Sequence, residues 1–214
     1  MLGVHLDIDD YLARLKTEID RLDRAEVGQL AEWICEAYEN EKFVYIFGNG
    51  GSATLASHLC EDLGKGTFSE ADLLEGSKRR LKVLSLTDNV GYLTALGNDM
   101  GYDQVFVQQL ASYARPGDLA IAISGSGNSP NVLKAVEWAN RNGLRTFGMT
   151  GYDGGKLKQL QQAGIHVPLE DMGMVESIHG CLIHWLVDDL FARFNRTGRH
   201  AGKAGSGAVQ EEIA

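Results

Sequence analysis

Leu119-Ala120-Ile121-Ala122-Ile123-Ser124-Gly125-Ser126-Gly127-Asn128-Ser129-Pro130 is the segment that decides the fold class. Its first five residues are apolar and typical of a buried strand, and residues 131–139 have the apolar spacing of a helix. The polar turn therefore lies where a strand ends and a helix begins. Helix amino ends carry unpaired N–H groups and partial positive charge, so the added serine hydroxyls favour an anion, most often a phosphate. An ordinary capped turn is the alternative reading of this segment taken alone.

A second segment of the same kind favours the anion site. Residues 42–47 are predicted to form a strand, Gly48-Asn49-Gly50-Gly51-Ser52 follows it, and residues 53–63 are predicted to form a helix. This loop partly matches the dinucleotide fingerprint GxGxxG. The acid expected to hold a ribose is poorly spaced, because a long insert precedes Asp88, and no P-loop lysine is present. We therefore expect a single compact phosphorylated ligand and no nucleotide cofactor.

The rest of the chain repeats the alternation of strand and helix. Further strands are predicted at residues 81–86, 145–149 and 165–167, and a last helix at residues 175–194. Short, wholly apolar strands separated by helices predict a doubly wound, five-stranded parallel α/β sheet with helices on both faces, flavodoxin-like or Rossmann-like. Such sheets bind ligands at the carboxyl ends of their strands.

The chain is predicted to have three parts. Residues 1–40 form an N-terminal helical hairpin, with helices near residues 8–22 and 27–38, that packs on the body or on a partner subunit. Residues 41–196 form the α/β domain, and residues 197–214 form a flexible tail. Within the domain, the polar residues 64–80 are expected to be a surface loop or an active-site flap.

Composition excludes several functional classes. The 214 residues carry 29 acidic and 20 basic side chains, a formal net charge of −9, which argues against binding to nucleic acid or an anionic membrane. The three cysteines are far apart and form no CxxC pair, and the start of the chain lacks the pattern of a signal peptide. No apolar run approaches the roughly 20 residues that a membrane span needs. We expect a cytoplasmic protein.

Two helices carry candidate catalytic or metal-binding side chains. His58 and Asp62 are four residues apart on one helix and share a face, which suits a divalent metal or acid–base chemistry. On the last helix, Glu176 and His184 lie about 80° apart, whereas His179 points about 140° away from His184. The alternatives are a polar surface for the first pair and a hydrogen-bonded core histidine for the second helix.

Taken together, these motifs resemble the sugar isomerase (SIS) domain family, and within it the sedoheptulose-7-phosphate isomerases. The resemblance covers nearly the whole chain. Its main motifs are the segments at residues 48–52, 96–99, 126–132 and 150–156, together with the His58 helix and the His179/His184 helix. It implies an aldose–ketose isomerase that makes glycero-manno-heptose 7-phosphate through an enediol, and a homotetramer with sites at subunit interfaces.

The resemblance also implies roles for individual residues. Phosphate would be held by Ser52, Ser124, Ser126 and Ser129, and Gly50, Gly51 and Gly125 would also belong to the substrate site. Gly125 stands where family members often have threonine, so one hydroxyl contact is missing here. His58, Asp62, Glu176 and His184 would gather at the active site and bind a divalent metal, as zinc is bound in some members. Asp62 would be the base, with Glu176 as metal ligand or alternative base, and His184 the acid. Asn49 and Asp88 would position sugar hydroxyls.

Two of these positions depart from the family. Asp62 replaces a glutamate, which shortens the reach of the base by one methylene, and Glu176 replaces a glutamine, which adds a charge. These departures leave open a second reading, a non-catalytic SIS protein that binds a sugar phosphate or a partner protein, like the scaffold proteins that associate with a replication initiator. A dinucleotide-dependent oxidoreductase is disfavoured by the imperfect fingerprint.

Overall fold

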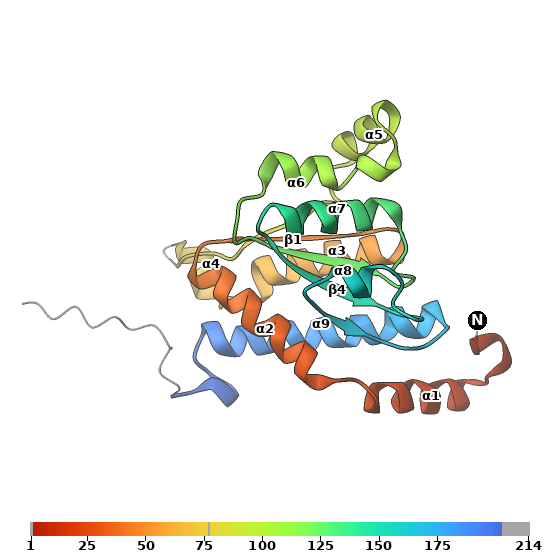
Figure 1. The fold of residues 1–214 in the computed structure, drawn as a ribbon. Helices are drawn as coiled ribbons and strands as arrows, with labels where there is room; N and C mark the ends of the chain where they lie inside the picture. Colours follow the sequence, from red (N-terminus) through yellow and green to blue (C-terminus); the bar gives the residue numbers. More distant parts are fainter. Residues whose placement is uncertain (1, 77, 203–214) are drawn as a thin grey trace, which may run out of the picture.

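The computed structural model describes residues 2–76 and 78–202 and is built around one parallel sheet (Figure 1). Its strands are β1 (Phe43–Gly48), β2 (Lys82–Ser85), β3 (Leu119–Ser124), β4 (Arg145–Thr150) and β5 (Ala163–His166). They are ordered β2-β1-β3-β4-β5, and every neighbouring pair is parallel. This is the flavodoxin-like order, so the doubly wound prediction is confirmed, and β1 and β3 meet where the strand order reverses.

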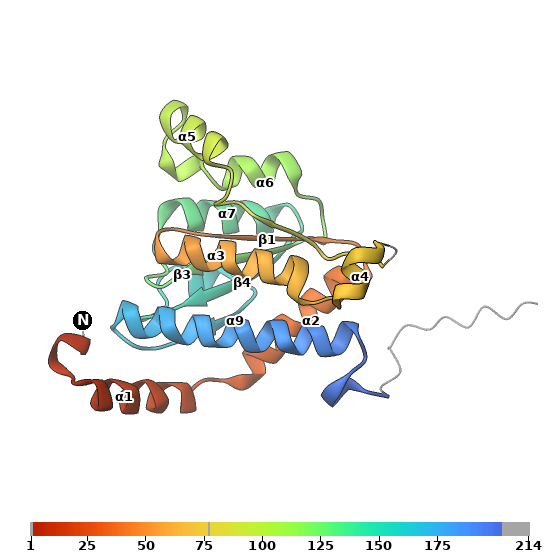
Figure 2. The same cartoon turned by 180° about the vertical axis from the view of Figure 1, so that it is seen from behind.

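Helices cover both faces of the sheet (Figures 1 and 2). One face packs against α2 (Arg24–Glu39), α3 (Gly51–Glu61) and α9 (Met172–Phe194). The other packs against α5 (Val90–Asp99), α6 (Val107–Tyr113), α7 (Pro130–Arg141) and α8 (Leu157–Leu160). Along β1, Val44 and Ile46 join the first core cluster and Tyr45 joins the second. A strand buried on both faces must be apolar at every position, which explains the uninterrupted apolar run in the sequence.

Both predicted N-terminal helices are present, and each packs on the body by itself. Helix α1 (Ile8–Asp20) places Tyr11, Leu15 and Ile19 against a small cluster that includes residues of α9. Helix α2 lies against the sheet and α9. In Figures 1 and 2, α1 extends along the start of α9 rather than folding back beside α2.

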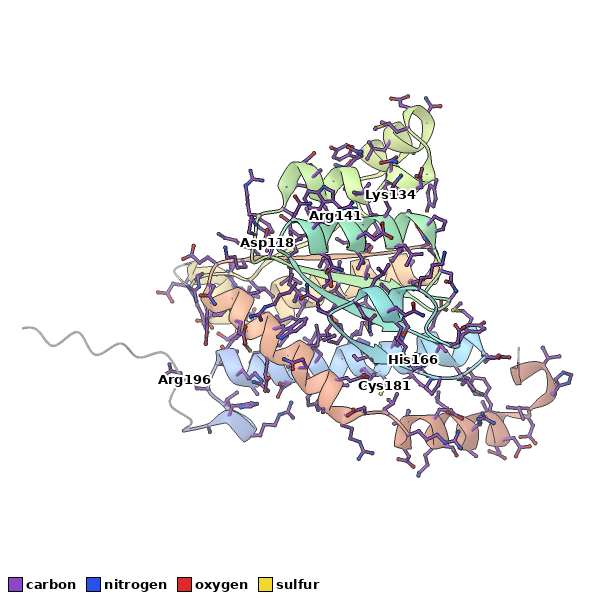
Figure 3. All side chains as sticks on the ribbon, in the orientation of Figure 1. Asp118, Lys134, Arg141, His166, Cys181 and Arg196 are labelled. Carbon is purple, nitrogen blue, oxygen red and sulfur yellow. The ribbon has the colours of Figure 1, made fainter. Side chains whose placement is uncertain are left out.

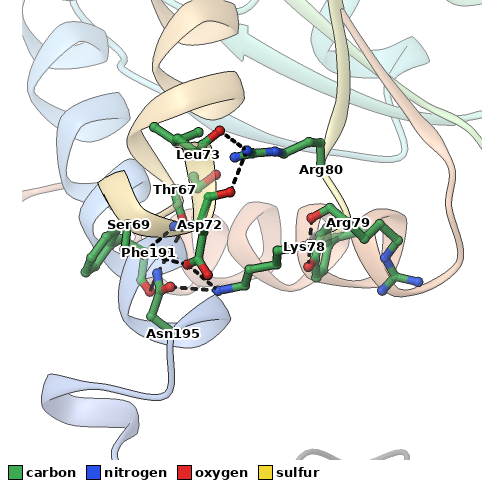
Figure 4. Close-up of polar contacts among 10 residues, drawn as sticks. Thr67, Ser69, Asp72, Leu73, Lys78, Arg79, Arg80, Phe191 and Asn195 are labelled. Atoms are coloured by element: carbon green, nitrogen blue, oxygen red, sulfur yellow. Dashed lines mark hydrogen bonds and ion pairs between the residues drawn. The ribbon is translucent and has the colours of Figure 1, made fainter. Parts of the chain in front are cut away.

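The segment at residues 64–80, expected to be a surface loop or an active-site flap, contains helical structure. It begins in a π-helical turn, η2 (Asp62–Gly66), and contains a short helix, α4 (Glu70–Glu75), capped by Ser69. Lys78 bonds to Asp72 and to Asn195 at the end of α9, and Asn195 bonds to the carbonyl of Thr67 (Figure 4). The described part of the segment is thus held against the end of α9, because Lys78 and the carbonyl of Thr67 both form hydrogen bonds with Asn195.

The predicted tail is ordered at its beginning. Residues Gly198–His200 form a 3-10 turn, η4, in which Arg199 and His200 bond to the carboxylate of Asp189, buried in α9. Residues 203–214 of the predicted tail lie outside the described residues. No described helix is both long enough and apolar enough to cross a membrane.

The three cysteines lie apart as free thiols. Cys35 and Cys60 are half-buried, and Cys181 is exposed on α9 (Figure 3). Burial raises the pKa of the Cys35 thiol to about 11. That thiol therefore stays protonated at neutral pH and behaves as a small apolar side chain.

His179 is a core histidine, as one of the two readings of the last helix predicted. Its side chain is 1% exposed, and its Nε2 has no hydrogen-bond partner among the described residues. Burial lowers the pKa of the imidazole to about 4, although a hydrogen bond with the backbone of Thr150 opposes this shift. The folded protein therefore holds His179 neutral at pH 7.

Acid is expected to destabilise the fold through this residue. The folded pKa lies below the value of about 6.5 of an unfolded histidine, so the unfolded state binds the proton first as pH falls. Between pH 7 and 5 this linkage lowers the free energy of unfolding by about 2 kcal/mol. Denaturant titrations of wild type and His179→Gln at both pH values measure it. The variant should lose most of this pH-dependent part, and an equal loss in both proteins would contradict the assignment.

Candidate functional site

The two glycine- and serine-rich loops lie side by side at the carboxyl ends of β1 and β3. The strands pair so closely that a Cβ added to Gly48 would lie 2.6 Å from the carbonyl oxygen of Ile123. A cavity of about 110 Å³ opens between the loops and the start of α9. It is lined by Asn49, Ser52, Ile123, Ser124, Gly125, Ser126, Ser129, Met172 and Glu176. The sequence placed most of these residues in one site, and the structure brings them together.

Two of the helices that begin at this cavity, α3 and α7, lack a side-chain cap at their N-cap residue. Asp7, Asp23, Asn89 and Asp171 accept hydrogen bonds from the first backbone N–H groups of α1, α2, α5 and α9. Among the described residues, the N-cap residues of α3 and α7, Gly50 and Ser129, make no such side-chain bond, although the Oδ1 of Asn131 accepts the amide of Val132 in the first turn of α7. The positive potential of these two helix ends is available to a ligand, although several of their first N–H groups already donate, as that of Ser52 does to Asn49 and that of Val132 does to Asn131. The structure thus favours the anion site over the ordinary capped turn.

The serine hydroxyls at the cavity are also available. Within the described chain, the side chains of Ser52, Ser124 and Ser129 make no hydrogen bond, whereas the Oγ of Ser126 accepts one from the amide of Asn128 at 3.3 Å. Ser52 and Ser124 are buried at 7% and 5% exposure. Their hydroxyls are not among the fully buried polar atoms without a partner, and both residues line the cavity, so these groups are open to a ligand there.

Asn49 joins the two loops. Its amide pairs reciprocally with the amide of Asn131 on α7, with both N···O distances 2.9 Å. The Oδ1 of Asn131 also accepts the amide of Val132, and the hydroxyl of Tyr102 donates to the Oδ1 of Asn49 at 3.1 Å. Because the oxygen of Asn49 already accepts two bonds, only one N–H of its side chain is left for a ligand. If Asn49 contacts a sugar hydroxyl as predicted, its side chain can therefore act only as a hydrogen-bond donor.

Residues at the end of β4 support the second loop from behind. The amide of Gly151 donates to the carbonyl of Gly125, and the amide of Leu157 donates to that of Gly127. Gly127 has φ +64°, and a Cβ there would lie 2.6 Å from the carbonyl carbon of Gly154. The motif at residues 150–156 is therefore a backbone support for residues 124–129, since only glycines allow this approach.

Two side chains of α9 close the cavity. A Cβ added to Gly125 would overlap the Sδ of Met172 and lie 2.9 Å from its Cε, so Met172 occupies the space that a threonine at position 125 would need. Glu176, one turn further, lies over Gly51, where an added Cβ would lie 2.8 Å from its Cδ. Glu176 therefore faces the amino end of α3 and the anion cavity.

The remaining predicted metal ligands form a separate cluster. The ligand atoms of His58, Asp62 and His184 lie within 4.8 Å of one another, and the two imidazole rings are 4.9 Å apart, edge to face. The Oδ2 of Asp62 is 3.3 Å from Nε2 of His58 and 3.8 Å from Nδ1 of His184. Asp62 begins the π-helical turn η2, a feature that often marks functional sites. Glu176 is outside this three-residue cluster.

Asp88 belongs neither to the lining of the anion cavity nor to the histidine cluster. Its carboxylate accepts hydrogen bonds from the hydroxyls of Ser57 and Thr87, the latter at 3.2 Å, and it lines a different, open cavity beside β2 and α6. The hydroxyls hold the carboxylate in one orientation. The predicted role of Asp88 toward the sugar stays a prediction.

Sequence reasoning missed three residues of the site: Met172, Tyr102 and Asn131. Met172 and Tyr102 carried no signal, because their positions depend on how α9 and the turn η3 (Tyr102–Gln104) pack. Asn131 could have been found, since it follows Ser129 and Pro130 in the motif at residues 126–132, directly after the predicted anion loop.

Comparison with known proteins identifies the family. The model of the SIS domain matches residues 9–151. The phosphoheptose isomerase of Geotalea daltonii is 38% identical over 168 residues, which cover 78% of this chain and 84% of that protein. The probable phosphoheptose isomerase of Thermoplasma volcanium is 33% identical over 181 residues, 85% of this chain and 89% of that one.

Solved structures agree with the sequence relatives. A phosphoheptose isomerase from Francisella tularensis superposes with a TM-score of 0.77 at 28% identity, covering 86% of this chain and 95% of that chain. The phosphoheptose isomerase from Neisseria gonorrhoeae gives 0.74 at 31% identity, covering 83% and 91%. With its sheet order, paired loops and histidine cluster, the chain belongs to the SIS domain family and, within it, to the phosphoheptose isomerases.

Proposed function

We propose that this protein is an aldose–ketose isomerase that converts sedoheptulose 7-phosphate into glycero-manno-heptose 7-phosphate. The observation that carries the proposal is the pairing of an anion cavity with a cluster of acid–base groups on the same two helices. Ser52 at the start of α3 lines the cavity, and His58 further along α3 belongs to the cluster. One end of the site suits a phosphate and the other suits proton transfer.

The spacing of the two ends fits a seven-carbon sugar. The six residues from Ser52 to His58 span about 9 Å along an α-helix. In an extended chain each bond advances about 1.2 Å, so the seven or eight bonds from phosphorus to C2 or C1 of a heptose 7-phosphate span about 8–10 Å. A pentose 5-phosphate is two bonds shorter and reaches only about 6–7 Å. The separation thus supports a heptose phosphate.

The proposed reaction moves one proton between neighbouring carbons. The carboxylate of Asp62 takes the proton from C1 of the ketose, and the C1–C2 enediol forms as the C2 carbonyl becomes a hydroxyl. Return of the proton to C2 then leaves the aldehyde at C1. His184, whose Nδ1 is 3.8 Å from Asp62, moves the accompanying proton between O1 and O2. Glu176, the alternative base implied by the family resemblance, lies at the anion cavity in this conformation, so Asp62 is the base that we propose.

A divalent metal, with zinc as the proposed ion, fits the cluster. Two imidazoles and a carboxylate are ligands that zinc accepts, and three protein ligands leave a position for substrate. Tetrahedral ligands at about 2.1 Å from zinc are about 3.4 Å apart, close to the 3.3 and 3.8 Å separations here. When bound, such a metal would polarise the carbonyl oxygen of the sugar.

A non-catalytic sugar-phosphate-binding protein is the second candidate. It is favoured by Asp62, whose carboxylate is one methylene shorter than the family's glutamate, because a displacement of about 1 Å of a catalytic group can cost roughly 100-fold in rate. The anion cavity would serve binding equally well. Turnover and metal binding discriminate the two candidates.

We also propose a cytoplasmic homotetramer. The support is a set of exposed apolar side chains near the N-terminus: Ile8 and Leu12 of α1 are 67% and 53% exposed, and Val4 in the preceding 3-10 turn (Leu2–His5) is 71% exposed. Such a face on a helix that already packs on α9 suits contact with another copy of the chain.

Removal of the proposed base or acid should abolish most turnover. Asp62→Asn and His184→Ala are each expected to lower kcat on sedoheptulose 7-phosphate by about 100-fold or more, because a positioned acid or base contributes roughly that factor. Glu61→Gln is the matched control, since Glu61 is adjacent but pairs with Lys65 on the surface. Full activity in both Asp62→Asn and His184→Ala would rule out this mechanism.

Zinc should bind at about one ion per chain. His58→Ala is expected to weaken the affinity by roughly 100-fold or more, since even the loss of a supporting residue costs 10- to 100-fold. Zinc content after dialysis and a competitive chelator titration measure both values. His5→Ala, a change at a histidine in the N-terminal turn, should bind like wild type. Equal affinity in His58→Ala would contradict the site.

The hydrogen-bonded pair of Asn49 and Asn131, which joins the two loops, is expected to support anion binding. Asn131→Leu removes the partner of Asn49 without adding charge and is expected to weaken inorganic phosphate binding by about tenfold, because an unpaired buried amide reorients. Calorimetric titration measures the affinity, and a thermal melt checks folding. Asn142→Leu, on the exposed end of the same helix, is the control. Unchanged affinity in folded Asn131→Leu would show that the pair has no such role.

A further inference from the structure

Glu176 lies at the anion cavity and away from the histidine cluster. Its carboxylate is seated over Gly51, the first residue of α3, where an added Cβ would lie 2.8 Å from the Cδ of Glu176 and would force that side chain to move. The cluster begins at His58, seven residues or about 10 Å further along α3. In this conformation Glu176 therefore places a negative charge where α3 presents its uncapped amino end.

The cavity has little positive charge to offset this carboxylate. None of the described residues that line it is a lysine or an arginine. The attraction for an anion comes from serine hydroxyls and from the amino ends of α3 and α7, each equivalent to roughly half a positive charge. One carboxylate cancels about as much charge as both helix ends supply.

A phosphate in the same cavity would lie within a few ångströms of Glu176. Two unit charges about 5 Å apart near a protein surface repel strongly enough to change a binding constant on the order of 100-fold, and water and salt reduce this to a smaller factor. The repulsion is larger for a dianion than for a monoanion. A bound phosphate must therefore either displace the Glu176 carboxylate or bind in spite of the electrostatic repulsion from it.

We propose that Glu176 lowers the affinity of the cavity for phosphate esters. Its carboxylate occupies the amino end of α3 and competes with a bound phosphate there. This inference rests on the proposed function, because it takes the cavity to be the phosphate site. If Glu176 weakens phosphate binding, the affinity for a sugar phosphate depends more on contacts of the sugar with His58, Asp62 and His184. Removal of the Glu176 charge should therefore increase the affinity for phosphate. A variant that is partly unfolded would not show such an increase.

The test is calorimetric titration of wild-type protein and variants with inorganic phosphate in metal-free buffer. Glu176→Gln and Glu176→Ala should each bind phosphate about tenfold or more tightly than wild type. Both are needed, because glutamine could add a hydrogen bond whereas alanine only removes the carboxylate. Glu170→Gln is the matched control, an exposed glutamate just before α9 and outside the cavity lining, and should stay within about twofold of wild type.

Each outcome decides between the two claims. Tighter binding in both Glu176 variants, with Glu170→Gln unchanged, supports the inference. Equal or weaker binding in Glu176→Ala overturns the role of Glu176 while leaving the phosphate site intact. A similar gain in Glu170→Gln also overturns it, because the effect would then follow from net charge alone. Absence of phosphate binding in wild type and all variants would overturn the proposed phosphate site itself.

Discussion

The parallel pairing of β1 with β3 is the constraint on which the site depends. Because these strands run side by side and the chain reverses its winding between them, the loops that follow them open at one edge. The approach is so close that Gly48 has no room for a side chain beside Ile123. Two helix ends without a cap from the N-cap side chain are thereby held around one small cavity, together with three serine hydroxyls that make no hydrogen bond within the described chain. An anion site is the chemical result of this arrangement.

The packing of α3 beside α9 sets the distance between the anion cavity and the histidine cluster. Gly51 meets Glu176 near the start of both helices, His58 meets His184 two turns later, and Gly66 meets Val187 beyond them. The two helices therefore run in the same direction, and the distance between anion cavity and histidine cluster follows from the rise of an α-helix. A substrate that uses both ends must have a matching length, which links the fold to the choice of sugar.

Much of this could be predicted from the sequence, for physical reasons that differ between elements. The strands were visible because burial on both faces demands continuous apolar runs, and the loops because glycine and serine cluster where those runs end. The grouping of His58, Asp62 and His184 came from the family resemblance. The placement of Glu176 could not be predicted, because its distance from His184 depends on the orientation of a flexible side chain between two packed helices.

Other features were hidden for local reasons. The helix α4 has only six residues, too few for a periodic apolar pattern, although Ser69 supplies a usual capping signal. The contact of Met172 with Gly125 joins residues 47 positions apart and leaves no trace in either local sequence. Long-range packing of this kind decides which side chains line the cavity. For the same reason, the reciprocal pair of Asn49 and Asn131 becomes evident only once the two loops are placed together.

Isomerisation of sedoheptulose 7-phosphate by the purified protein in deuterated water tests the central claim most directly. Proton transfer through an enediol predicts an aldose 7-phosphate with solvent deuterium at C2, detected by NMR spectroscopy. Formation of this labelled product at a rate that depends on Asp62 and His184 would support the account. Binding of the sugar phosphate without any aldose product or deuterium incorporation would contradict it and identify the protein as a sugar-phosphate-binding member of the family.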